Sequence, residues 1–301
     1  MSGSMQRYLE SKRSVDDRAL NRRVLSRFAD GLTARARERD GPVRLVEVGA
    51  GVGAMVHRLA AWDVLPPRLS YRAVDVDEGS IAYAGERLPE WLADEGYAVE
   101  RRGDGLLARK ESGGVDRRLE ISLETADAFA IEGTADAVVA CAFLDVVDLE
   151  AALSTVAGLL RDGGLLYAPI TFDGGTGFVP THPLDDRIER LYHRHMDELR
   201  DEPGSSRAGS RAIARLPDAG FSLLEVGGAD WIVHPHGNAY PDDEDVFVDH
   251  LLGTIDGALA AYPQSVLEPA DRERWIELRR GQLDRCELVF VAHHLDLLAR
   301  A

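Results

Sequence analysis

A short apolar run followed by three closely spaced glycines constrains the fold more than any other feature of this sequence. The run at 43–48 reads as a buried strand, Gly49, Gly51 and Gly53 follow at once, and helical spacing begins at Met55. A buried strand, a tight turn and a helix form the first unit of a doubly wound α/β sheet. Glycine permits positive φ and lets the backbone approach a ligand closely. The sequence therefore predicts a nucleotide-like cofactor at this turn.

The glycine pattern alone fits two classes of cofactor. Residues 49–54 also match the dinucleotide fingerprint in its G-x-G-x-x-A form, which is a weak signal by itself. Glu47 lies two residues before the first glycine, where a carboxylate accepts from an amino group but repels a pyrophosphate. The surrounding motifs therefore have to decide between the classes.

Acidic residues follow the next predicted strands. The strand at 71–75 ends in Asp75, which suits two ribose hydroxyls, and the strand at 119–123 is followed by Asp127 beside an aromatic residue. A fourth strand at 135–141 leads into Ala142-Phe-Leu-Asp145. A helix, the turn Leu-Leu-Arg-Asp-Gly-Gly at 159–164 and a fifth strand at 165–170 come next.

In this order the motifs resemble the class I S-adenosylmethionine-dependent methyltransferases, over roughly 43–175 and the returning elements at 211–233 and 284–298. The resemblance implies a Rossmann-like sheet of seven mostly parallel strands with helices on both faces, and S-adenosyl-L-methionine as cofactor. It implies that Asp75 holds the ribose and that Asp127 contacts the adenine amine. The cofactor residues expected are Glu47, Gly49, Ala50, Gly51, Gly53, Asp75, Val76, Asp127, Ala128 and Ala142.

Simpler interpretations remain open at this point. One interpretation is that the glycines form a tight turn that binds no ligand. A second is that Asp75 and Asp77 are turn residues, and a third is that Asp127 only caps a helix. Two other functions also remain, an NAD(P)-dependent oxidoreductase and a catalytically silent cofactor-binding regulatory or scaffold protein.

The chain is expected to form a single domain, residues 1–301, with a helical cap added to the sheet. The predicted parts are an N-terminal helical segment at 1–40, a core at 41–175, 211–233 and 284–301, and cap insertions at 176–210 and 234–283. Residues 14–17 fit a capping box. Residues 171–177 predict a flexible turn after the fifth strand, and 184–200 predict an amphipathic helix. The basic residues of the N-terminal segment are expected to form a solvated face, or alternatively to contact an anionic substrate. They are Lys12, Arg13, Arg18, Arg22 and Arg23.

In this fold an acceptor meets the methyl group beyond the carboxyl ends of the fourth and fifth strands. That placement makes Asp145, Asp173 and His195 candidate catalytic residues. The candidate substrate-binding residues are Phe143, Phe172, Tyr192 and Trp231. Plain packing is the alternative for His195 and Trp231. The Asn/Asp-Pro-Pro-Tyr/Phe motif of enzymes that methylate amino groups is missing after the fourth strand, so a small molecule is the expected acceptor, with the methylated atom left open.

Charge and composition limit the possible partners. The formal net charge is −17, from 52 acids and 35 bases, and Lys12 and Lys110 are the only lysines. An acid excess with scarce lysine is typical of a halophilic protein, although GC-rich coding also replaces lysine with arginine. Nucleic acid is not an expected partner because its phosphates are repelled. No metal is expected, because the histidine pairs have no obvious partners.

The cellular location follows from what the sequence does not contain. It has no long apolar run and two cysteines without metal-ligand spacing, so a cytoplasmic protein that does not bind membranes is expected. The oligomeric state stays open, with a homodimer as one option.

Overall fold

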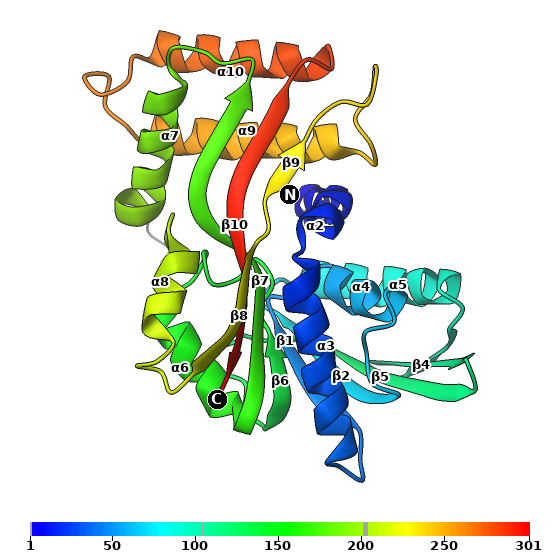
Figure 1. The fold of residues 1–301 in the computed structure, drawn as a ribbon. Coiled ribbons are helices and arrows are strands. Elements are labelled where there is room, and N and C mark those ends of the chain that lie inside the picture. The colour runs from blue at the N-terminus through cyan, green and yellow to red at the C-terminus, as the bar shows by residue number, and fades with distance from the viewer. Residues whose placement is uncertain (1, 104, 201–203) are drawn as a thin grey trace.

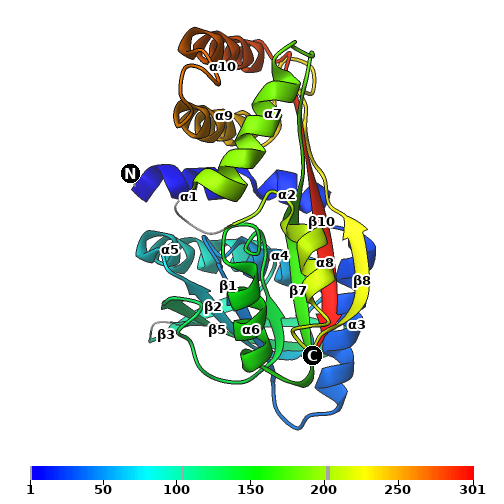
Figure 2. The same ribbon diagram turned by 90° about the vertical axis from the view of Figure 1, so that its left-hand side faces the viewer.

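The computed structural model describes residues 2–103, 105–200 and 204–301 and has two tiers (Figures 1 and 2). The lower tier is a twisted sheet with helices on both faces. The upper tier holds three helices, α7 (Asp185–Arg194), α9 (Glu244–Ala260) and α10 (Pro269–Asp284), packed on strands that continue upward out of the sheet. We call this upper tier the cap.

Within the described residues, ten strands form one sheet in the order β3-β4-β5-β2-β1-β6-β7-β10-β8, and β9 pairs with β10. Neighbours from β5 to β7 are parallel, and β10 runs antiparallel to both β7 and β8. The mostly parallel sheet predicted from the sequence is therefore confirmed. Its strands are β1 (Val43–Val48), β2 (Arg68–Asp75), β5 (Val115–Thr125), β6 (Ala135–Val139), β7 (Leu160–Val179), β8 (Ser222–Gly228) and β10 (Val289–Arg300). The additional strands are β3 (Ala98–Arg102), β4 (Gly105–Ser112) and β9 (Trp231–Val233).

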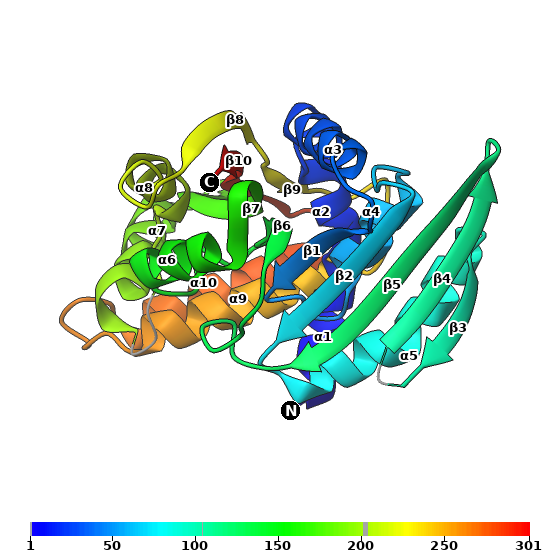
Figure 3. The same cartoon turned by 90° about the horizontal axis from the view of Figure 1, so that it is seen from below.

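Both faces of the parallel strands are buried, which explains the continuous apolar run in β1. Leu45 packs with α3 (Arg22–Arg37), α4 (Ala54–Ala61) and α5 (Glu78–Asp94). Val46 and Val48 point to the opposite face, toward α6 (Leu149–Leu159) and α8 (Ala208–Arg215). Figure 3 shows α6 and α8 on one side of the sheet and α3 on the other.

The predicted flexible turn at 171–177 is wrong, because the chain there continues as strand β7. Phe172 pairs with His294 and Thr176 pairs with Ala292, so three residues of β7 lie opposite one residue of β10. Within this bulge Gly174 and Gly175 have φ of 89° and 69°, values that glycine adopts readily. The two glycines therefore bend a long strand whose upper half supports the cap.

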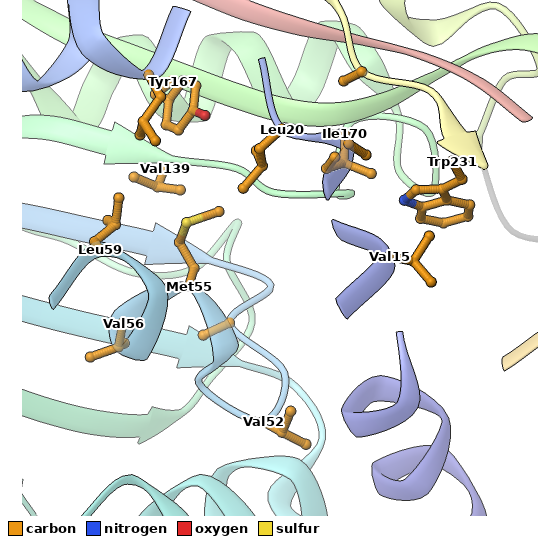
Figure 4. Close-up of a cluster of buried hydrophobic side chains, with 14 of the residues drawn as sticks. Val15, Leu20, Val52, Met55, Val56, Leu59, Val139, Tyr167, Ile170 and Trp231 are labelled. Carbon is orange, nitrogen blue, oxygen red and sulfur yellow. The ribbon is translucent and has the colours of Figure 1, made fainter. Parts of the chain in front are cut away.

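The N-terminal segment forms three helices: α1 (Ser2–Ser11), α2 (Arg13–Ala19) and α3. The predicted capping box at 14–17 is wrong. Ser14 Oγ instead donates to Glu244 Oε1 at 2.7 Å, which ties α2 to the cap, and the side chain of Asn21 caps α3 by accepting from Val24 N. Figure 4 shows Val15 of α2 and Leu20, the residue after α2, among the buried side chains of α4, β6, β7 and β9.

The predicted helix at 184–200 is present as α7 followed by a π-helical turn, η1 (His195–Leu199). In the described part of the chain no helix is both long and apolar enough to cross a membrane.

Candidate active site

A cavity of about 800 Å³ opens at the carboxyl ends of the parallel strands, where an α/β sheet of this kind binds ligands. The loops after β1, β2, β5 and β6 form its floor, and it is covered by Met5, Tyr8 and Leu9 of α1 and by Lys12, which lies between α1 and α2. Of the cofactor residues expected from the sequence, it brings together Glu47, Gly49, Ala50, Gly51, Asp75, Val76, Asp127, Ala128 and Ala142. Gly53 does not line the cavity.

The three glycines after β1 have different structural roles. All have positive φ, at 68°, 52° and 78° for Gly49, Gly51 and Gly53. A Cβ on Gly49 would lie 2.7 Å from the ring of Phe143, and one on Gly51 would lie 3.3 Å from Leu9 of α1. Gly53 caps α4 and packs against Leu88, so its role is local folding rather than contact with the cavity.

Asp75 is held in place by the backbone at the end of β2. Its Oδ2 accepts from Gly51 N at 2.7 Å and its Oδ1 accepts from Asp77 N at 2.9 Å. Each carboxylate oxygen keeps a second lone pair for a ligand hydroxyl. Asp77 has a different role: it caps α5 by accepting from the backbone and hydroxyl of Ser80.

The mouth of the cavity exposes apolar side chains that a globular protein normally covers. Val76 is 75% exposed, Val146 45% and Phe129 42%, and all three line the cavity. The rings of Phe129 and Phe143 lie 6.4 Å apart between centroids. Asp127 Oδ1 accepts from Phe129 N at 2.9 Å. This end of the cavity therefore suits a flat, partly apolar group with a polar edge.

The inner end of the cavity carries buried charges that the sequence analysis missed. Lys12 was expected on a solvated face, but it is buried and its Nζ lies 3.2 Å from Asp16 Oδ2. Trp231 Nε1 donates to Asp16 Oδ1 at 2.9 Å, and Arg58 Nη2 lies 3.8 Å from Asp16 Oδ2. Burial lowers the pKa of Lys12, but the interactions with Asp16, Tyr8 and Cys141 together outweigh burial and raise that pKa, so the amine is charged. The scarcity of lysine was the one sequence signal that could have singled it out.

Glu47 is buried beside this charged cluster. Its Oε2 accepts from the hydroxyl of Tyr71 at 2.7 Å. Burial raises the pKa of Glu47 to about 8, although the bond from Tyr71 and the charge of Arg58 act in the opposite direction. The carboxyl group is thus largely protonated at neutral pH until a cation contacts it.

A second cavity, of about 370 Å³, lies under the cap and meets the first at four shared residues: Tyr8, Asp145, Val146 and Trp231. Its other walls come from α7, η1, α9 and three strands that we call the stem strands: β7 from Phe172 onward, β9 and β10. Among the predicted acceptor residues, Phe172, Tyr192 and His195 line this second cavity, Phe143 lines the first, and Asp145 and Trp231 line both.

Asp173 lies outside both cavities, contrary to the expectation that it faces the acceptor. Its Oδ1 accepts from the backbone and the hydroxyl of Ser210, each at 2.8 Å, near the start of α8. The bulge in β7 begins at this residue, and its carboxylate is used to anchor α8 against the sheet. Asp173 therefore anchors α8 and does not face the acceptor.

Two polar atoms of residues that line the second cavity have no hydrogen-bond partner among the described residues. They are Asp145 Oδ1 and His195 Nδ1, and both atoms are buried. Burial raises the pKa of Asp145 to about 6, against the lowering effects of backbone hydrogen bonds and of Lys12 and Arg200. Buried polar atoms are normally satisfied, so these two are available to a bound molecule.

Comparison with known families agrees with the fold. Residues 46–166 match the family described as "Methyltransferase domain", a segment that contains the glycine turn, Asp75, Asp127 and Asp145. Among curated proteins, none matches this chain significantly.

Several solved methyltransferase structures are distantly similar. A putative methyltransferase from Bacillus halodurans has 13% identity and a TM-score of 0.47, with 89% of this chain and 96% of that chain covered. A SAM-dependent methyltransferase from Geobacter sulfurreducens, in complex with S-adenosyl-L-homocysteine, has 14% identity and a TM-score of 0.43, covering 93% and 91%. Magnesium protoporphyrin IX methyltransferase from Synechocystis PCC 6803 has 17% identity and a TM-score of 0.39, covering 71% and 78%.

These similarities are too distant to transfer a substrate from one protein to another. The family match confirms the resemblance over the segment that it covers: residues 46–166 form a methyltransferase domain.

Proposed function

We propose that this protein transfers the methyl group of S-adenosylmethionine to a small-molecule acceptor bound beneath the cap. The observation that carries the proposal is the meeting of the two cavities at Tyr8, Asp145, Val146 and Trp231. A donor in the larger cavity and an acceptor in the smaller one are neighbours at that junction. In-line displacement needs this proximity and a site from which water is excluded.

The residues of the larger cavity suit each part of the cofactor. By the family resemblance, Asp75 holds the ribose hydroxyls and Asp127 the adenine amine, with Val76 and Phe129 against the flat base. At the inner end Glu47 suits the amino group and Lys12 suits the carboxylate, because each pairs with a group of opposite charge. The bound cofactor supplies an activated methyl group on a sulfonium.

The remaining task of the chain is to hold the acceptor, exclude water and remove a proton where the acceptor has one. α1 covers the larger cavity and the cap covers the smaller one, which supports a small molecule over a polymer as acceptor. The charge of −17 also disfavours nucleic acid.

Calorimetry with S-adenosylmethionine, S-adenosylhomocysteine and NAD tests the proposal. We expect the first two to bind and NAD not to bind. Gly51→Val places a branched side chain at φ 52° next to Leu9, so binding of S-adenosylhomocysteine should weaken by about a hundredfold or more.

Gly113→Val is the matched control. Gly113 has φ 59° in the β4–β5 hairpin, and a Cβ added there would have no atom within 4 Å, so the backbone strain is similar without any contact to the cavity. Binding of NAD, or unchanged cofactor binding in Gly51→Val, contradicts the proposal. Cofactor binding without turnover of any acceptor would favour the catalytically silent alternative.

A further inference from the structure

The acceptor cavity is bordered by aromatic rings from widely separated parts of the chain. Tyr8 of α1 stacks on His250 of α9, with ring centroids 4.1 Å apart. On the stem strands, the ring of His294 lies 4.1 Å from Trp231 and 5.3 Å from Phe172. All five side chains line the cavity. Aromatic faces favour contact with flat, polarisable molecules, so the lining suits an aromatic acceptor.

The charges in the cavity disfavour an anionic acceptor. Among the described lining residues, one is acidic, Asp145, and one is strongly basic, Arg200. Arg200 already interacts with other groups of the protein. His294 adds no positive charge, because burial lowers its pKa to about 3. Its Nδ1 lies 3.1 Å from the carbonyl oxygen of Ala292, which only accepts, so Nδ1 carries the proton.

Asp145 is the polar group at the point where the two cavities meet. Its Oδ1 is buried and has no hydrogen-bond partner within the described residues. A buried carboxylate oxygen without a partner is costly, so it favours a ligand that donates a hydrogen bond to it. A donor from the acceptor molecule would sit beside the methyl group. The charged and titratable groups around Asp145 come from separate parts of the chain: Tyr8 of α1, Lys12 between α1 and α2, Tyr192 of α7, Arg200 after η1 and His294 of β10.

We propose that the acceptor is an uncharged, flat aromatic molecule that is methylated at an O–H or N–H group, and that Asp145 receives the proton. This inference rests on the proposed function. The acceptor's oxygen or nitrogen forms a bond to the methyl carbon as the carbon–sulfur bond breaks. The electron pair of that bond stays on sulfur, and the proton passes to Oδ1 of Asp145 and then to solvent. No oxidant or reductant takes part.

Binding of simple probes to the protein saturated with S-adenosylhomocysteine tests the substrate class. The flat probes 2-naphthol and indole should bind, decahydro-2-naphthol should bind about tenfold or more weakly because it is puckered, and 2-naphthoate should not bind measurably. If neither flat probe binds, or if the saturated alcohol or the carboxylate binds as tightly, the proposed class is wrong. Failure of the proposed function would give a different result in this experiment, because S-adenosylhomocysteine itself would then not bind.

The role of Asp145 is tested by comparing 2-naphthol with its methyl ether, 2-methoxynaphthalene. In the natural protein the naphthol should bind about tenfold or more tightly, because only it donates to a charged acceptor. Asp145→Ala should bring this ratio close to one when both probes are measured at a saturating concentration of S-adenosylhomocysteine.

Asp148→Asn is the matched control for this experiment. Asp148 lies on the same loop, lines neither cavity and caps α6 by accepting from Ala151 N, a role that asparagine also fills. Its naphthol-to-ether ratio should equal that of the natural protein. Equal binding of naphthol and ether in the natural protein, or an unchanged ratio in Asp145→Ala, would overturn the role of Asp145.

Discussion

The two cavities of this protein are built in different ways. The larger one is formed mainly by loops at the ends of adjacent parallel strands, and backbone groups position its key side chain, Asp75. The smaller one is formed by side chains from α1, the stem strands, α7, η1 and α9, which are brought together only by the cap. The residues of the larger cavity are therefore positioned by local backbone geometry, whereas those of the smaller cavity are positioned by the tertiary packing of the cap.

The largest expected effect concerns Asp75, on the cofactor side of this comparison. Asp75→Ala removes the acceptor of Gly51 N and the proposed ribose contact at once, and hydrogen bonds to charged groups contribute about 1.5–3 kcal/mol each. Affinity for S-adenosylhomocysteine should fall by roughly one to three orders of magnitude, measured by calorimetry. Circular dichroism should show an intact fold. An unchanged dissociation constant would place the ribose elsewhere.

A smaller effect is expected from the protonation of Glu47. Because its pKa is raised to about 8, the free protein must lose a proton when an ammonium group binds there. Cofactor affinity should therefore rise by about tenfold between pH 6.5 and 7.5, with proton release detectable in buffers of different ionisation enthalpy. Glu47→Gln should abolish both effects. The same pH dependence in that variant would exclude Glu47 as the contact of the amino group.

The raised pKa of Glu47 also predicts how stability depends on pH. The folded protein holds this proton more tightly than the unfolded chain, so the stabilisation is complete below the ordinary pKa and is lost as pH rises toward 8. The free energy of unfolding of the natural protein should fall between pH 5 and pH 8 more steeply than that of Glu47→Gln, as measured by urea denaturation. Equal slopes would show that Glu47 is not protonated in the free protein.

The smallest expected effect concerns His195 and Asp173, two residues predicted on the acceptor side. His195→Ala should lower methyl transfer roughly three- to tenfold at unchanged cofactor affinity, because its Nδ1 is available to the acceptor. Asp173→Ala should instead lower the melting temperature by loosening α8. Loss of melting temperature and cofactor affinity together in His195→Ala would indicate that this histidine is a packing residue.

The sequence predicted the sheet and much of the larger cavity because those residues are local. A strand, its turn and the following helix are contiguous, so Gly49, Gly51 and Asp75 were identified from neighbouring residues alone. It did not predict that 171–177 continue β7, because the pairing partner lies more than a hundred residues away in β10. Lys12, Asp16 and Arg58 were missed for a related reason, since only tertiary packing buries them together. Asp173 was misplaced because it follows Phe172 within strand β7, where neighbouring side chains point to opposite faces, and Phe172 is the residue that lines the cavity.

A crystal structure of the protein with S-adenosylhomocysteine tests most directly whether the two cavities form one active site. The account predicts the adenine beside Val76 and Phe129, the ribose on Asp75, and the sulfur facing Asp145 and Trp231 at the junction of the cavities. A ligand bound elsewhere, or a sulfur that faces away from the cavity under the cap, would contradict it.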